Sequence, residues 1–110
     1  MSFYFDYHSG RYKEVLYTIT DSAGNYVDLT DSTLIKWAGA TSENANTNVV
    51  EKSWPASGIV VVEPVSGLVS IVLSGVELTP GTYYHQSMYR LHGQDVHVDE
   101  GTFWVRATII

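Results

Sequence analysis

The side chains that could do chemistry are densest between His92 and Glu100. This stretch holds His92, Asp95, His97, Asp99 and Glu100. In an extended strand, side chains two residues apart point to one face, so Asp95, His97 and Asp99 would lie together. Imidazole and carboxylate groups bind zinc and other divalent ions. These residue types also suit a solvated hairpin, and no second segment is marked as the source of a further ligand. We therefore predict neither a metal site nor a cofactor.

No pattern in the sequence indicates a catalytic site. The chain lacks the G-x-S-x-G motif that marks many nucleophilic serines. His85 lies in an alternating run, where a buried, hydrogen-bonded side chain is expected rather than a general base. Asp28 and Asp31 could imitate the carboxylate pair of a glycosidase, but they flank a turn, where Asp side chains bond to the backbone. We predict that the protein is not an enzyme; a hydrolase that uses His85 or the 92–100 stretch is the alternative.

The composition limits the partners that the chain can bind. Its 110 residues suit one domain over residues 1–110, which can build a core without disulfides, and it has no Cys. The net charge of −6 opposes binding to phosphate backbones and to anionic membranes. No window approaches the ~18 apolar residues of a membrane span, and the N-terminus lacks the parts of a signal peptide. We therefore expect a chain made in the cytoplasm, without a nucleic-acid or membrane partner.

The remaining pattern is that of strands. No stretch has a helical apolar period, whereas about eight strand-sized runs recur between turns rich in Gly, Pro, Asn and Asp. Residues 1–10 are predicted to hold an N-terminal arm or edge strand, and residues 39–48 a surface loop. The other predicted strands cover residues 11–20, 26–30, 32–38, 49–53, 58–63, 68–73, 82–91 and 101–110.

The longest predicted strand, Thr82–Leu91, begins at a corner. Pro80 has a fixed φ and no N–H, and Gly81 tolerates angles that other residues avoid, so the chain turns there. Tyr83 follows, as in the tyrosine corner of Greek-key sandwiches, where its hydroxyl bonds back to the corner backbone. The residues therefore predict an all-β sandwich of about 7–9 strands. Its predicted core contains Val15, Tyr17, Ile19, Ile35, Trp37, Val69, Ile71, Leu73, Tyr83, Phe103 and Val105.

Several short motifs follow one another in order along the chain. They are residues 17–21, residues 24–33 (GNYVDLTDST) with Trp37, residues 67–73, the 78–83 corner, a turn at Gly93, and residues 101–105. In this order and spacing, the chain from about Tyr12 to Val105 is similar to the immunoglobulin-like domains of tailed-phage tail and baseplate proteins. The N-terminal domain of baseplate upper proteins is the nearest type.

The resemblance implies an immunoglobulin-like antiparallel β-sandwich with a noncatalytic, structural role in a virion. Such domains usually begin a longer protein, whereas this sequence ends at Ile110, so the resemblance leads us to expect a small virion component. The family residues that match are scaffold residues: Gly24, Leu29, Trp37, Pro80, Gly81, Tyr83 and Gly101.

The first functional hypothesis is a virion protein that binds other virion subunits in the tail, baseplate or fibre-docking region, or that decorates the capsid. Its partners would be other virion proteins and further copies of itself. Large apolar side chains outside the core would anchor such contacts. The predicted interface residues are Phe3, Tyr4, Phe5, Trp54, Tyr84, Met88, Trp104 and Ile110.

Two alternatives remain open for these aromatic residues. The N-terminal arm could pair beside the C-terminal strand and cover its aromatic side chains within the domain itself. A carbohydrate-binding β-sandwich module is the second functional hypothesis, because exposed Trp and Tyr rings stack on sugars and Asn and Asp bond to their hydroxyls.

Overall fold

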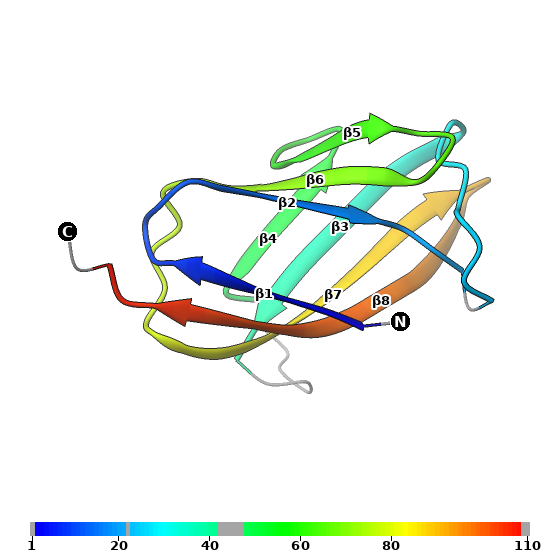
Figure 1. The fold of residues 1–110 in the computed structure, drawn as a ribbon. Coiled ribbons are helices and arrows are strands. Elements are labelled where there is room, and N and C mark those ends of the chain that lie inside the picture. The colour runs from blue at the N-terminus through cyan, green and yellow to red at the C-terminus, as the bar shows by residue number, and fades with distance from the viewer. Residues whose placement is uncertain (1, 22, 42–47, 109–110) are drawn as a thin grey trace.

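The chain folds into two β-sheets that face each other (Figure 1). The computed structural model describes residues 2–21, 23–41 and 48–108, with the side chains of all of these but 2, 3, 98 and 99. The described residues form eight strands and no helix. The strands are β1 (Ser2–His8), β2 (Lys13–Thr18), β3 (Ser32–Ala40), β4 (Val50–Trp54), β5 (Ile59–Glu63), β6 (Leu68–Leu73), β7 (Gly81–Leu91) and β8 (Gln94–Arg106).

The strand order is that of an immunoglobulin-like sandwich, as predicted. One sheet has five strands in the order β1-β8-β7-β3-β4, and the other has three in the order β2-β6-β5. Strands β7, β8, β3 and β4 occupy the places of strands F, G, C and C′ of variable-type domains, and β2, β6 and β5 those of B, E and D. The two sheets enclose one hydrophobic core.

The N-terminal segment is an edge strand, which settles one alternative left open by the sequence. Strand β1 runs parallel to β8, with Ser2 opposite Glu100 and His8 opposite Arg106. Every other pair of these strands is antiparallel, so the predicted antiparallel sandwich carries one parallel pair, at its edge. A parallel edge strand is possible here because β1 and β8 are far apart in sequence, so no tight turn has to join them.

The core follows the predicted alternation. Trp37, Ile19 and Phe103 are completely buried, and all eleven side chains predicted for the core are among the buried ones. Sequence reasoning did not include Tyr7, which is 1 % exposed. Its hydroxyl donates to the carbonyl oxygens of Arg11 and Val76, at 2.8 and 2.9 Å. Burial raises the pKa of this hydroxyl, so it stays a neutral donor.

The tyrosine corner is confirmed. The Tyr83 hydroxyl donates to the carbonyl oxygen of Thr79 at 2.6 Å, four residues earlier in the chain. This bond ties the start of β7 to the segment that enters it. At the far end of β7, His92 and Gly93 both have positive φ (52° and 78°), as a type I′ hairpin requires, so β7 turns directly into β8.

The predicted loop over residues 39–48 begins too early. Gly39 and Ala40 belong to β3, and residues 42–47 lie outside the described part of the chain. A Cβ on Gly39 would lie 2.8 Å from Phe103 Cε1 and 2.9 Å from Val50 Cγ1, so glycine lets β3 pass beneath the Phe103 ring. The sequence pattern predicts a loop at this glycine, because the need for glycine arises from tertiary packing that the pattern does not show.

Strand β8 begins earlier than predicted. It starts at Gln94, so the predicted strand over 101–110 is the second half of a longer one that ends at Arg106. The β7–β8 register shifts between Ser87 and Met88, which lets the polar 94–100 stretch continue the ladder. Ile109 and Ile110 lie outside the described residues.

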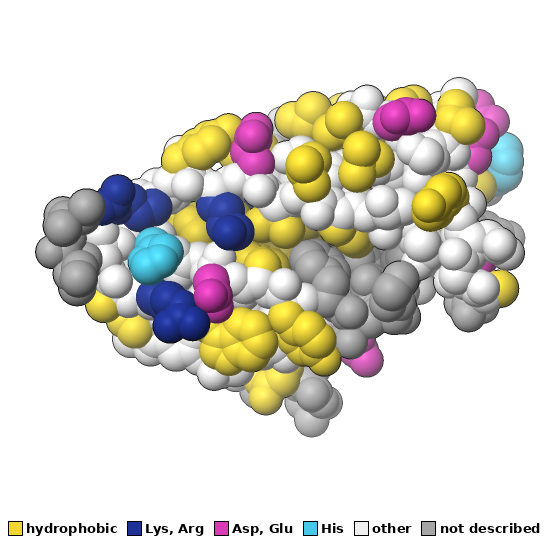
Figure 2. Space-filling model, in the orientation of Figure 1, with side chains coloured by type: hydrophobic (Ala, Val, Ile, Leu, Met, Phe, Trp, Pro, Cys, Tyr) yellow, Lys and Arg dark blue, Asp and Glu magenta, His cyan; other side chains and the backbone are white. Residues whose placement is uncertain are grey.

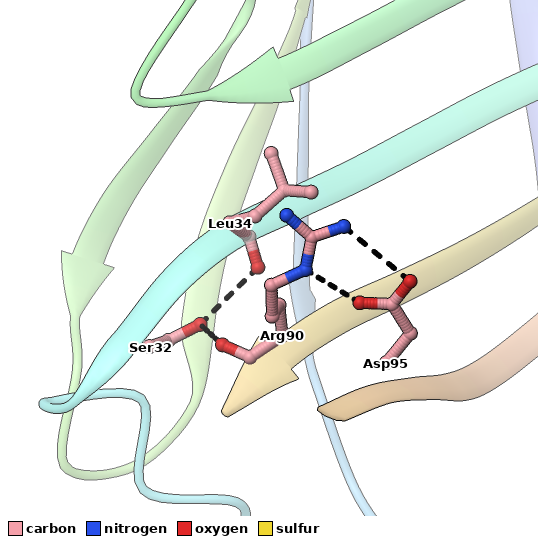
Figure 3. A network of polar contacts seen from close by, with 4 residues as sticks. All are labelled: Ser32, Leu34, Arg90 and Asp95. Atoms are coloured by element: carbon pink, nitrogen blue, oxygen red, sulfur yellow. Dashed lines mark hydrogen bonds and ion pairs between the residues drawn. The ribbon is translucent and has the colours of Figure 1, made fainter. Parts of the chain in front are cut away.

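A second register shift lies between Ser32 and Leu34, where β3 begins beside the end of β7. The Ser32 hydroxyl shares its hydrogen between the carbonyl oxygens of Arg90 and Leu34, at 3.0 and 3.2 Å (Figure 3). The hydroxyl thus supplies a hydrogen-bond donor where the register shift interrupts the regular bonding between β3 and β7, which explains a buried serine at this position.

Candidate functional site

The outer face of the five-stranded sheet carries the strongest candidate site. Residues directly opposite each other on neighbouring strands share a face. Tyr4 on β1 lies opposite Thr102 on β8, which lies opposite Tyr84 on β7. Trp104 follows Thr102 on the same face of β8. These four residues, with Gln86 and Glu100 in the adjoining row, are called the aromatic face below.

Two rings of the aromatic face form an exposed pair. The ring centroids of Tyr4 and Trp104 are 5.9 Å apart, with an angle of 33° between their planes. Tyr4 is 60 % exposed and Trp104 37 %. Figure 2 shows hydrophobic side chains gathered along the β1 and β8 side of the molecule. The pair thus fixes two large apolar surfaces in one orientation and leaves both open to a partner.

Beside the ring pair, the sheet surface is hollowed. A hollow of about 220 Å³ is lined by Tyr4, Tyr84, Gln86, Glu100 and Thr102, together with the backbone near Gly101. A second hollow of about 190 Å³ lies on the other side of Gln86. Its lining includes Ala38, Met88 and His97. The face therefore combines ring surfaces with amide, carboxylate and hydroxyl groups.

The predicted interface residues fall into three groups. Tyr4, Tyr84 and Trp104 come together on the aromatic face, and Met88 lies on the same side of the sheet beside the second hollow. Phe5 and Trp54 point inward and pack against the core.

The inward position of Phe5 follows from strand alternation. It places the Phe5 ring on that of Phe103, with centroids 5.0 Å apart and planes at 2°. Phe5 is thus a partner within the domain, in contrast to the interface prediction. The side chains of Phe3 and Ile110 lie outside what the structure describes.

Residues 94–100 of the candidate ligand stretch belong to β8, and His92 lies in the hairpin turn before it. The side chain of Asp99 lies outside what the structure describes. Within the described part of the chain, no three His, Asp or Glu side chains lie close enough to hold a metal ion. Arg90 Nε donates to Asp95 Oδ1 at 2.6 Å (Figure 3). This hydrogen bond, with the charge of Arg90, lowers the pKa of Asp95. Asp95 is therefore paired with Arg90 on the neighbouring strand of the hairpin.

The candidate acid–base groups are also in structural roles. His85 is 1 % exposed and lies among the rings of Phe5, Trp37 and Phe103. A substrate in solution cannot reach it. Asp28 accepts hydrogen bonds from the backbone N–H and the hydroxyl of Thr30, the turn role predicted for it.

Sequence reasoning missed the polar members of the aromatic face, Gln86, Glu100 and Thr102. Alternation along β7 places Gln86 between Tyr84 and Met88 on one face, and that signal could have found it. Glu100 and Thr102 could not be found in this way, because their position depends on the register of β8 against both β1 and β7.

The described residues include no helix that is long and apolar enough to cross a membrane. No protein-family model matches this sequence, and no curated protein is similar to it.

Proposed function

We propose that the protein is a noncatalytic structural protein that binds other protein subunits through its aromatic face. The observation that carries this proposal is the exposed Tyr4–Trp104 pair, which stands beside Tyr84 and a polar hollow on an open sheet surface. Large aromatic side chains with nearby hydrogen-bonding groups are the residues that dominate protein–protein binding energy.

The free energy of burying aromatic side chains favours a partner that covers the aromatic face. Moving a large aromatic side chain from water into an interface contributes roughly 1.5–3 kcal/mol. The two rings are already held against each other, so little side-chain freedom remains to be lost on binding. Strand β1 is itself paired to β8, which makes the platform part of the folded sheet.

We further propose that the assembly is a phage virion and that the protein sits in its tail, baseplate, fibre-docking region or capsid surface. Support comes from the order of motifs that resembles immunoglobulin-like domains of tail and baseplate proteins. The partners are other virion proteins and further copies of the chain, repeated by the symmetry of the particle.

The test of location is mass spectrometry of purified virus particles, in which the chain should occur at a fixed copy number. A photo-crosslinking amino acid in place of Trp104 should then join the protein to a virion subunit. The same residue in place of Tyr26, which is 71 % exposed in the segment between β2 and β3 and is not part of the aromatic face, is the matched control. Particles that lack the chain contradict the virion assignment, and equal crosslinking from both positions contradicts the aromatic face.

A carbohydrate-binding module is the second candidate, and one observation favours it. Gln86, Glu100 and Thr102 line the hollow directly beside the ring of Tyr4, so stacking and hydrogen bonding could act on one sugar. Binding of the wild-type protein on a glycan array, abolished in Trp104→Ala and kept in Tyr26→Ala, would favour this function over the first.

A further inference from the structure

Strand β2 leaves one edge of the three-stranded sheet open. The sheet has the order β2-β6-β5, so β2 pairs with β6 on one side (Figure 1). No strand in the described part of the chain pairs with its other side. An open edge presents a row of backbone N–H and C=O groups that another strand can bind. The edge of β2 is therefore a place where a further strand can join the sheet.

The hydrogen bonds between β2 and β6 show which residues face the open edge. In an antiparallel pair, only every second residue exchanges hydrogen bonds with the neighbouring strand. The pairing continues just past β2 to Ile19, whose N–H donates to the Gly67 carbonyl at 2.8 Å. Steps of two residues back from Ile19 give the odd-numbered residues of β2, which therefore bond to β6. The even-numbered residues Glu14, Leu16 and Thr18 turn their N–H and C=O groups toward the open edge.

The other side of β6 agrees with this assignment. Val72 of β6 lies opposite Glu14 of β2 in the register. Its N–H does not point to β2 but donates to the carbonyl oxygen of Gly58, beside the start of β5, at 2.8 Å. Even-numbered residues of β6 therefore bond toward β5, and the groups of Glu14 that lie opposite them point away from β6.

The side chain at the centre of the open edge is apolar and exposed. Leu16 is 63 % exposed on the outer face of the sheet. Its neighbour across β6 is Ser70, whose small side chain covers little of the leucine. A strand bound at the open side would bring a side chain against Leu16 and remove apolar surface from water, which favours binding.

The other sheet edges carry features that hinder pairing with another chain. Irregular register, proline and charged side chains all act in this way. Strand β5 has a register shift and is followed by Pro64, and the short strand β4 is followed by Pro55. Strand β1 has Asp6 on its outer face, in an ion pair with β8. Strand β2 pairs without a register shift, and its charged residues, Lys13 and Glu14, occupy only its first two positions.

We propose that β2 pairs antiparallel with β2 of a second copy of this chain, across a two-fold axis at Leu16. The two three-stranded sheets then become one continuous sheet. Residues 14, 16 and 18 face the edge in both copies, so this register places Leu16 opposite Leu16 and Glu14 opposite Thr18. About six backbone hydrogen bonds form across the axis.

A second copy suits this edge because the edge is complementary to itself. The two exposed leucine side chains come together on one face, and each Glu14 carboxylate lies opposite an uncharged threonine rather than another carboxylate. A two-fold contact uses the same edge of both copies, so association stops at a dimer. The contact involves none of the residues of the aromatic face, and it neither uses nor depends on the function proposed above.

The first test is sedimentation velocity of the full chain at rising concentration. Pairing of two strand edges is a small contact, so association should be weak and appear at about 0.1–1 mM. The largest species should be a dimer. A protein that stays monomeric at about 1 mM, or that continues to larger oligomers, would overturn the proposal.

Hydrogen exchange of the wild-type protein locates the contact without any variant. The backbone N–H groups of Glu14, Leu16 and Thr18 should exchange at least about twofold more slowly at about 1 mM than at about 10 µM, because pairing protects them. The N–H of Val15 bonds to β6 in the monomer and should change little. A dimer that leaves the three N–H groups unprotected would overturn the proposal.

Charge substitutions test the two-fold axis. Leu16→Lys alone and Leu16→Glu alone should each abolish association, because like charges meet at the axis. A mixture of the two variants should regain association as a heterodimer. Val60→Lys is the matched control, since Val60 is 53 % exposed on the outer face but lies on β5, and it should leave association unchanged.

Each variant must keep the wild-type melting temperature, which the exposed position of Leu16 favours. Trp104→Ala separates this contact from the aromatic face and should leave dimer formation unchanged. Failure of the mixed variants to associate would overturn the pairing. So would association that survives Leu16→Lys and is lost in Trp104→Ala, because the contact would then lie on the aromatic face.

Discussion

Tyr83 shows how one side chain fixes a corner of the fold. Its ring stacks on Phe103, with centroids 5.3 Å apart, and its hydroxyl reaches back to the Thr79 carbonyl. Tyr83→Phe keeps the ring and removes the hydrogen bond. We expect a loss of roughly 0.5–1.5 kcal/mol in the free energy of unfolding, measured by urea denaturation. Tyr26→Phe, in an exposed side chain, is the control and should be neutral.

At the scale of single residues, the structure predicts that Asp28 makes the stability of the fold depend on pH. Hydrogen bonds from the Thr30 hydroxyl and backbone N–H lower its pKa below the ordinary value of 3.8. Because the pKa of Asp28 is lower in the folded protein than in the unfolded chain, its carboxylate stabilises the fold at pH values above the unfolded-state pKa. This contribution is lost as the pH falls through the folded-state pKa. NMR titration should show Asp28 titrating below 3.8, and Thr30→Val should raise its pKa. An unchanged pKa in Thr30→Val would contradict this account.

At the scale of elements, β1 belongs to the sandwich and also presents part of the aromatic face. Its inward residues Phe5 and Tyr7 contact the core, while Tyr4 points outward. Deleting residues 1–7 should therefore lower stability by roughly 3–6 kcal/mol, from the burial of two aromatic side chains. Trp104→Ser should leave the melting temperature nearly unchanged and reduce subunit binding. Thermal unfolding followed by circular dichroism measures the melting temperatures of both variants, and an unaltered melting temperature after the deletion would contradict the role given to β1.

At the scale of the whole molecule, stability comes from one core between two sheets, in a chain without cysteine. We expect no loss of stability when divalent ions are removed. A chelator should leave the melting temperature unchanged. An ion that bound the native state would stabilise it, so removing such an ion would lower the melting temperature. A drop that zinc or calcium reverses would contradict this expectation and direct attention to His92, His97 and Glu100.

The sequence by itself determined the fold class, the core and the turns. Alternation placed Val15, Tyr17 and Ile19 inside, and Pro80-Gly81 before Tyr83 predicted the corner, because these signals act over a few neighbouring residues. The immunoglobulin-like arrangement came from the order of short motifs along the chain.

Only the tertiary structure decided the rest, because it depends on pairing between distant segments. The parallel register of β1 with β8 turns a possible arm into an edge strand and divides its aromatic residues, Tyr4 to the outside and Phe5 to the core. The same register brings Tyr4, Thr102 and Tyr84 into one row across three strands. Local patterning carries no information on which strands become neighbours, so the aromatic face could not be predicted from it.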